Sequence, residues 1–195
     1  MSEEASALVE DRLKSLGVNV MTNKKVESED DDSIIISGKD IPSQTVVWTS
    51  GVSNHPFFAE HGDIFPLAKN GRVEVDKHLK VSNHIYVIGD NANTPYTGLA
   101  QTAIHDGHYV AKAIKAEVRK TSLPVYKPKK NPVVIPVGEN WAILEYGPLR
   151  VTGFLASWIR KAADLIGYLD FFPVFKAVDI WESEGQRAEE CSACI

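Results

Sequence analysis

One stretch of the sequence, residues 85–107, combines a carboxylate at the end of an apolar segment with a predicted helix start. Residues 85–88 are apolar and include β-branched and aromatic side chains, and Gly89-Asp90 follow directly. This pattern predicts a buried strand that delivers the Asp90 carboxylate at its C-terminal tip. A helix predicted to begin near Gly98 points free N–H groups into the same crevice. The two features together predict a binding site for a polar ligand.

The chemistry that suits this arrangement is that of a flavin. A helix N-terminus carries about half a positive charge, which stabilises the negative charge that develops at the N1–C2=O edge of a reduced flavin. The Asp90 carboxylate can accept a hydrogen bond from a ribityl hydroxyl of the same cofactor. Gln101 and His105 are four residues apart and share one helix face, where His105 can donate a proton near neutral pH. The alternative is a polar face on a surface helix.

The same residues resemble a known group of enzymes. The apolar run that ends in Gly89-Asp90 resembles the second FAD motif of pyridine-nucleotide-dependent flavin oxidoreductases. Residues 100–107 are similar to the Ala-Gln-x-Ala-x-Gln-x-Gly signature of type II NADH dehydrogenases, with His105 in place of the second glutamine. The Gly-Asp motif alone marks a broad superfamily, and the two motifs together narrow it to this group.

The resemblance extends over most of the chain. Residues 46–51 resemble the strand that links the NADH and FAD modules of these enzymes, and the part from Gly138 onward is similar to their membrane-binding tail. The match implies a fragment of an FAD-dependent NADH dehydrogenase, which passes electrons from NADH through FAD to a quinone. FAD is the implied cofactor, NAD(P)H the implied substrate, and a homodimer the implied assembly of the complete enzyme.

Residue roles follow from the resemblance position by position. Asp90 would contact the ribityl–phosphate region, and Gln101 and Thr102 would offer N–H groups to the pyrimidine edge of the flavin. Gln101 would also line the quinone site, and with His105 it forms the predicted catalytic pair. The predicted cofactor-binding residues are Gly51, Gly89, Asp90, Ala92, Ala100, Gln101 and Thr102.

Two other functions fit the same residues. His105 departs from the family glutamine, which leaves open a related soluble FAD-dependent NAD(P)H oxidoreductase whose acceptor is a ferredoxin, a rubredoxin or a sulfide-linked partner. Sulfide-oxidising relatives depend on core cysteines, and this chain has none before Cys191. A non-catalytic interaction module that kept the scaffold and lost the cofactor is the third possibility.

The glycine-rich turns that cradle nucleotide phosphates are missing from the sequence. No G-x-G-x-x-G motif occurs, although both FAD and NADH sites of such enzymes need one. The chain also starts on a helical pattern with no strand before it. We therefore expect a truncated product or one piece of a split protein, which alone would bind FAD poorly and oxidise NADH negligibly.

The predicted fold class is α/β. We expect incomplete FAD/NAD(P)-binding Rossmann-like, three-layer domains and a small α+β C-terminal domain with an amphipathic helix. The predicted domains are a NAD(P)-domain remnant at 1–50, the C-terminal half of the FAD domain at 51–120, and an acceptor-associated domain with a flexible tail at 121–195. The predicted helices cover residues 3–16, 98–119 and 151–169. The predicted strands cover residues 18–20, 24–27, 33–37, 44–48, 71–76, 85–90 and 141–146.

Two helices carry informative faces. For the helix at 98–119, the apolar spacing predicts a buried face made by Ala103, Gly107, Val110, Ala111, Ile114 and Val118. In the helix at 151–169, apolar side chains stand opposite Arg160, Lys161 and Asp164, as in helices that lie in a lipid headgroup layer. The alternative for the second helix is a cover over a domain core or a dimer interface. With the resemblance, we expect peripheral membrane contact through 151–181, on the cytoplasmic side.

Bulk properties exclude several classes of protein. The 195 residues carry a net charge of −5, which argues against a nucleic-acid surface. No apolar stretch is long enough to span a bilayer as a helix. The histidines outside the helix at 98–119 lack metal-ligand spacing, and the acidic run at 27–32 predicts a solvated hairpin tip, so we predict no metal. Cys191 and Cys194 form a C-x-x-C pair that we interpret as part of a flexible tail rather than a redox or metal site.

Overall fold

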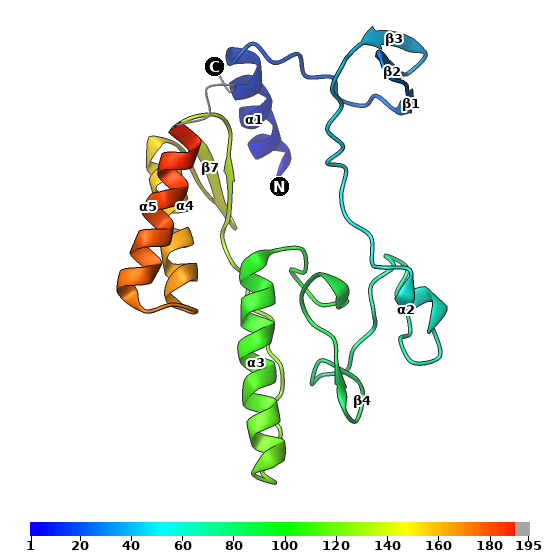
Figure 1. The fold of residues 1–195 in the computed structure, drawn as a ribbon, viewed down its shortest axis with the longest axis vertical. Helices are drawn as coiled ribbons and strands as arrows, with labels where there is room; N and C mark the ends of the chain where they lie inside the picture. Colours follow the sequence, from blue (N-terminus) through cyan, green and yellow to red (C-terminus); the bar gives the residue numbers. More distant parts are fainter. Residues whose placement is uncertain (190–195) are drawn as a thin grey trace. The chain divides into compact units, whose positions relative to one another are not determined.

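The computed structural model describes residues 1–189, with side chains described through Ser183. It contains two compact units, one formed by Met1–Val47 with the C-terminal segment from Pro132, the other by Trp48–Asn131 (Figure 1). Helices and small sheets alternate in both, which confirms the mixed α/β class. The two units are defined by contacts within this chain and do not test the predicted division into domains 1–50, 51–120 and 121–195. That division stays a prediction.

The first unit begins with helix α1 (Glu3–Ser15), as predicted. The Ser2 side chain caps it by accepting a hydrogen bond from the Ala5 amide at 3.2 Å, and acidic residues occupy its first turn. Gly17 follows its end with φ of 82°, a conformation that glycine adopts without strain. Strand β7 (Ala142–Tyr146) lies against α1, and the backbone N–H of Ser2 donates to Glu145 on that strand.

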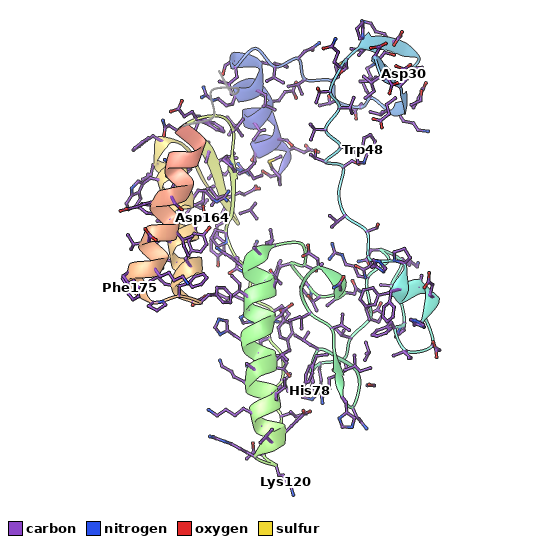
Figure 2. All side chains as sticks on the ribbon, viewed as in Figure 1. Asp30, Trp48, His78, Lys120, Asp164 and Phe175 are labelled. Atoms are coloured by element: carbon purple, nitrogen blue, oxygen red, sulfur yellow. The ribbon has the colours of Figure 1, made fainter. Side chains whose placement is uncertain are left out.

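An antiparallel meander follows, with the order β1 (Val26–Glu29), β2 (Ser33–Ile36) and β3 (Lys39–Pro42). The acidic run forms the β1–β2 turn, as predicted, because the Asp30 carboxylate accepts the Ser33 amide at 2.7 Å (Figure 2). The predicted strands at 18–20 and 44–48 are wrong, since neither forms a ladder. An apolar segment becomes a strand only beside a partner edge, and the described part of the chain offers none to these two.

The C-terminal part of the first unit is a three-stranded antiparallel sheet covered by a helical hairpin. Its strands are β6 (Val133–Pro136), β7 and β8 (Leu149–Gly153), with β7 in the middle. Helix α4 (Phe154–Leu169) buries Ala156 against Ala142 and Leu144. Helix α5 (Val174–Glu189), which the sequence analysis did not separate from α4, runs beside it (Figure 1).

The second unit contains short elements around two small cores. They are α2 (Phe57–Glu60), β4 (Lys80–Ser82), β5 (Ile85–Tyr86), the 3-10 turn η1 (Gly89–Asn91) and α3 (Ala100–Val118). The predicted strand at 85–90 shortens to β5, and that at 71–76 makes only isolated bridges, including a parallel one between Val73 and Ala92. One core joins Phe65, Val73, Val87 and Ala92; the other joins Leu79, Tyr109, Ala113 and Tyr126.

The buried face of α3 differs from the predicted one. Thr102, Asp106, Tyr109 and Ala113 are buried, whereas Ile114 is 46% and Val118 79% exposed. The polar members of the buried face are retained because they make hydrogen bonds to the segments that cover them. Gly107, also placed on the predicted buried face, is not closely packed: a Cβ there would meet nothing within 4 Å.

Candidate functional site

The Gly89–Asn91 turn is the point where the predicted site residues meet. Gly89 is buried with φ of 62°, and a Cβ at this position would lie 3.3 Å from the Ala103 Cβ of α3. Only glycine combines this backbone conformation with so close an approach to a helix. Asp90 follows with an exposed side chain. The turn thus packs against the N-terminal half of α3 and leaves the Asp90 carboxylate accessible, as the sequence predicted.

Three segments close the turn with hydrogen bonds. The Thr97 hydroxyl donates to the Gly89 carbonyl oxygen at 2.9 Å. Arg72 Nη1 donates to the Thr97 hydroxyl at 2.7 Å and to the Asp90 carbonyl oxygen. Asn54 Nδ2 donates to the Asn91 carbonyl oxygen at 3.2 Å. The backbone that carries Asp90 is therefore held by side chains from positions 54, 72 and 97, none of which was singled out from the sequence.

The first two amides of α3 have no acceptor among the described residues. Leu99 precedes the helix and provides no side-chain cap. The Thr102 amide donates to the Leu99 carbonyl oxygen at 2.9 Å, and its part in flavin binding stays a prediction. The amides left without a described acceptor are those of Ala100 and Gln101, and both residues are exposed. The parts of Ala100 and Gln101 in cofactor binding stay predictions.

Asp106 is the charged residue that sequence reasoning missed. It is fully buried, its Oδ2 accepts the Gly89 amide at 3.0 Å, and its Oδ1 accepts the Tyr126 hydroxyl at 2.6 Å. Burial raises the pKa of Tyr126, and the hydrogen bond to Asp106 and its charge raise it further. The available signal was spacing: Thr102, Asp106 and Tyr109 recur at helical intervals on one face. We call Arg72, Gly89, Thr97, Asp106 and Tyr126 the turn cluster.

The predicted catalytic pair lies on one continuous helix. Gln101 and His105 are one turn apart on α3, as expected. Gln101 is exposed, whereas His105 is half-buried with its ring centroid 5.7 Å from that of Tyr126. His105 Nε2 lies 3.0 Å from the Lys127 carbonyl oxygen. Because a carbonyl only accepts, this geometry assigns a proton to Nε2. The catalytic role of the pair stays a prediction.

The two outlying site residues lie differently. Ala92 is fully buried in the core with Val73, so its side chain supports the turn from below. Gly51 is exposed with φ of 101° and has nothing within 4 Å of its Cβ position. Its predicted part in cofactor binding is untouched by these contacts and stays a prediction.

Another polar network in the same unit includes His78. It lies beside α3, where its Nδ1 is 3.2 Å from the Tyr109 hydroxyl and 2.8 Å from the Pro124 carbonyl oxygen (Figure 2). The described residues contain no cluster of three histidine, cysteine or acidic side chains that could hold a metal ion. The predicted tail cysteines, Cys191 and Cys194, lie outside the described residues.

Comparison with known proteins gives the family. The profile described as "Pyridine nucleotide-disulphide oxidoreductase" matches residues 1–107, more than half of the chain. The chain belongs to this family. The resemblance inferred from the Gly89-Asp90 motif is therefore confirmed at the family level.

Two curated relatives narrow the comparison within the family. The chain is 30% identical over 174 residues to the type II NADH:quinone oxidoreductase Ndh of Mycobacterium tuberculosis (strain ATCC 25618 / H37Rv), covering 80% of this chain and 37% of that protein. It is 31% identical over 105 residues to a probable NADH dehydrogenase of Dictyostelium discoideum, covering 51% and 23%. The chain thus spans well under half the length of either relative.

Solved structures of family members agree on the fold. NDH2 from Plasmodium falciparum in complex with NADH matches with a TM-score of 0.78 at 16% identity, over 97% of this chain and 55% of that one. A NAD-dependent persulfide reductase from A. fulgidus matches with a TM-score of 0.62 at 22% identity, over 74% and 28%. At these identities the matches establish the fold.

The helical hairpin formed by α4 and α5 exposes many large apolar side chains. No helix in residues 1–189 is long and apolar enough to cross a membrane. The apolar side predicted for α4 divides: Ile159, Ala162 and Leu165 are half-buried, whereas Phe154, Leu155, Trp158, Ile166 and Leu169 are exposed. We call the following set the apolar hairpin face: Phe154, Leu155, Trp158, Ile166, Leu169, Phe171, Val174 and Phe175, each 42–77% exposed.

Proposed function

We propose that this chain supplies the flavin-contacting and acceptor-side segment of an FAD-dependent NADH:quinone oxidoreductase. The observation that carries the proposal is the convergence of an accessible carboxylate, Asp90, with a helix start whose amides at 100 and 101 have no acceptor in the described chain. The similarity to a type II NADH:quinone oxidoreductase supports the choice among family chemistries. The soluble oxidoreductase and the non-catalytic module are less favoured by that similarity.

The residues of the turn fit FAD. Because Gly89 has no side chain, the turn packs directly against α3, which keeps Asp90 next to the first half of the helix. Asp90 would hold a ribityl hydroxyl, and the amides of Ala100 and Gln101 would donate to the pyrimidine edge. When bound, FAD supplies hydride acceptance from NAD(P)H and electron transfer to the acceptor. The chain itself supplies orientation and fixed dipoles.

Gln101 and His105 would serve the acceptor. Gln101 can donate a hydrogen bond from its amide to a quinone oxygen. His105 is held through Nε2 by the Lys127 carbonyl, so Nδ1 is the nitrogen that would exchange a proton with the quinone. A histidine ring at this position can give or take a proton, which a glutamine amide cannot.

The apolar hairpin face would rest on the membrane that holds the quinone. Exposed aromatic and aliphatic side chains beside Lys161 and Lys176 match a helix pair seated in a headgroup layer. We infer a peripheral location on the cytoplasmic side and a homodimeric complete enzyme. In that enzyme, residues 1–50 would belong to the NAD(P) domain, 51–120 to the FAD domain and 121–195 to the membrane-associated domain.

Titration with FAD tests the proposal on the chain itself. Flavin fluorescence is followed for the wild type, for Asp90→Ala and for Asp63→Ala, an exposed carboxylate of the same unit that serves as the charge-matched control. We expect weak binding by the wild type, a loss of about tenfold or more with Asp90→Ala, and no change with the control. Equal affinities for the two variants, or no flavin signal with any protein, would overturn the proposal.

A further inference from the structure

Asp106 is a buried carboxylate in the middle of a helix. Its exposure is 0%, and its two oxygens have different partners: Oδ2 accepts the Gly89 amide, and Oδ1 accepts the Tyr126 hydroxyl. Burying a carboxylate costs several kcal/mol unless hydrogen bonds compensate for the lost water. An apolar side chain would serve ordinary packing better at this position. The two bonds are therefore the reason to look for a specific role.

The first bond controls the turn that presents Asp90. The Gly89 amide immediately precedes Asp90, and it is buried, so without Asp106 it would have no partner. On the carbonyl side of the same residue, the Thr97 hydroxyl donates to the Gly89 oxygen. Both the amide and the carbonyl of Gly89 are thus hydrogen-bonded, and Asp106 is the acceptor for the amide.

The second bond ties the turn to the segment that orients His105. The Tyr126 amide donates to the Lys77 carbonyl oxygen at 3.0 Å, which fixes the backbone of this segment. The next residue, Lys127, supplies the carbonyl that holds His105 Nε2. One side chain therefore connects the backbone beside Asp90 with the backbone beside His105.

We propose that Asp106 is a positioning residue, which fixes the turn that carries Asp90 and couples it to the Tyr126–Lys127 segment that orients His105. This inference rests on the proposed function for the identity of the ligand at Asp90. The structural part of the proposal, the hydrogen bond from the Gly89 amide to Asp106, can be tested without any ligand.

Amide hydrogen exchange at Gly89, measured by NMR on the full chain, tests that part. Asp106→Leu keeps the size and removes both acceptors, and we expect Gly89 to exchange about tenfold to a hundredfold faster. Asp106→Asn can still accept from Gly89 and donate to the Tyr126 oxygen, so it should restore exchange to within about threefold of the wild type.

A pair of tyrosines supplies the matched control. Tyr126 and Tyr109 are both buried, pack edge to face at 5.3 Å, and each donates one hydroxyl hydrogen bond. Tyr126→Phe should speed exchange at Gly89 about fivefold, and Tyr109→Phe, normalised to the exchange of buried α3 amides, should leave it unchanged. Equal effects of the two tyrosine variants would show general loosening and overturn the proposal. An unchanged exchange rate at Gly89 in Asp106→Leu would overturn it as well. If Asp106→Leu does not fold, the milder tyrosine variants decide the matter.

Titration of the same variants with FAD separates this inference from the proposed function. If FAD binds, Asp106→Leu should weaken it about tenfold, and Asp106→Asn should restore most of the affinity. Faster exchange at Gly89 with unchanged FAD affinity would refute the link to Asp90. If the wild type shows no flavin signal at all, the proposed function fails, and the exchange data alone decide whether Asp106 holds the turn.

Discussion

The turn cluster and the apolar hairpin face differ in where their side chains find partners. In the turn cluster, the polar groups of Asp106, Thr97 and Arg72 are paired within the chain. In the hairpin, α4 and α5 direct large apolar groups outward, and Phe175 near the turn between them is 77% exposed (Figure 2). The first region is held in one geometry by hydrogen bonds, whereas the second leaves a large apolar area exposed.

The difference separates two kinds of functional surface. A binding turn needs fixed donors and acceptors, because a polar ligand is recognised by where those groups point. A surface that rests on lipid needs apolar area and few directional contacts. Substitutions should therefore act through geometry at the turn and through area at the hairpin, and the following predictions test that distinction.

The largest effect is expected at the hairpin. A double substitution, Trp158→Asp with Phe175→Asp, removes two exposed apolar side chains, each worth about 1.5–3 kcal/mol when buried. We expect the wild-type chain to sediment with anionic phospholipid vesicles and the double variant to lose about a hundredfold or more in partitioning. Val118→Asp, on an exposed α3 position, is the control and should still sediment. A wild type that stays in the supernatant would show that this face covers protein instead.

A pair of glycine substitutions gives the next largest effect, with opposite signs. Gly89→Ala places a Cβ 3.3 Å from Ala103 at a positive φ, which costs about 1–2 kcal/mol for the conformation alone. Gly107→Ala, within α3, meets nothing within 4 Å and should stabilise the helix by about 0.5–1 kcal/mol. Thermal unfolding followed by circular dichroism measures both. Destabilisation of similar size by both substitutions would contradict the requirement for glycine at position 89.

Sequence reasoning succeeded where a local pattern determines the structure. The helices predicted at 3–16 and 98–119 follow from short-range signals, and the structure has them at Glu3–Ser15 and Ala100–Val118. The Gly89-Asp90 motif located the turn that carries Asp90, because its backbone geometry requires glycine at a fixed place. These features depend on residues a few positions apart, so a single sequence contains them.

The failures involve partners that lie far away in the sequence. Strands predicted at 18–20 and 44–48 had the right residues and no neighbouring edge. The buried face of α3 was misplaced because Asp106 is polar in sequence, and its partner Tyr126 is 20 residues away. The role of a charged residue in a core can be recognised only once its partners are known. That is why Asp106 was missed, whereas Gly89 and His105 were singled out from the sequence.

A smaller effect is expected from the hydrogen bond that joins the two hairpin helices. Trp181 Nε1 donates to the Lys161 carbonyl oxygen at 2.7 Å. Trp181→Phe keeps most of the apolar area and removes this donor, so we expect a loss of about 1 kcal/mol in unfolding free energy. Chemical denaturation followed by helical circular dichroism measures it. Vesicle partitioning should stay within about twofold of the wild type, since that depends on area; a large loss would show that hairpin geometry matters as well.

The smallest effect concerns the pH dependence of α1 docking. Hydrogen bonds from Ser2 hold the pKa of Glu145 below its usual range, and the positive N-terminus and Arg150 contribute. Because the folded-state pKa is depressed, the stabilisation is fully present above the ordinary carboxyl value of about 4.3 and is lost as the pH falls through the lower, folded-state value. Trp141, over which the Arg12 guanidinium lies at 5.8 Å, reports the docking by fluorescence.

Acidification from pH 6 to pH 3 should therefore change Trp141 fluorescence only in the lower part of this range. Glu145→Gln removes the titrating group and should flatten that transition, whereas Glu139→Gln, an exposed neighbour in the β6–β7 connection, should leave it in place. A transition that persists unchanged in Glu145→Gln would mean that another group governs the docking of α1.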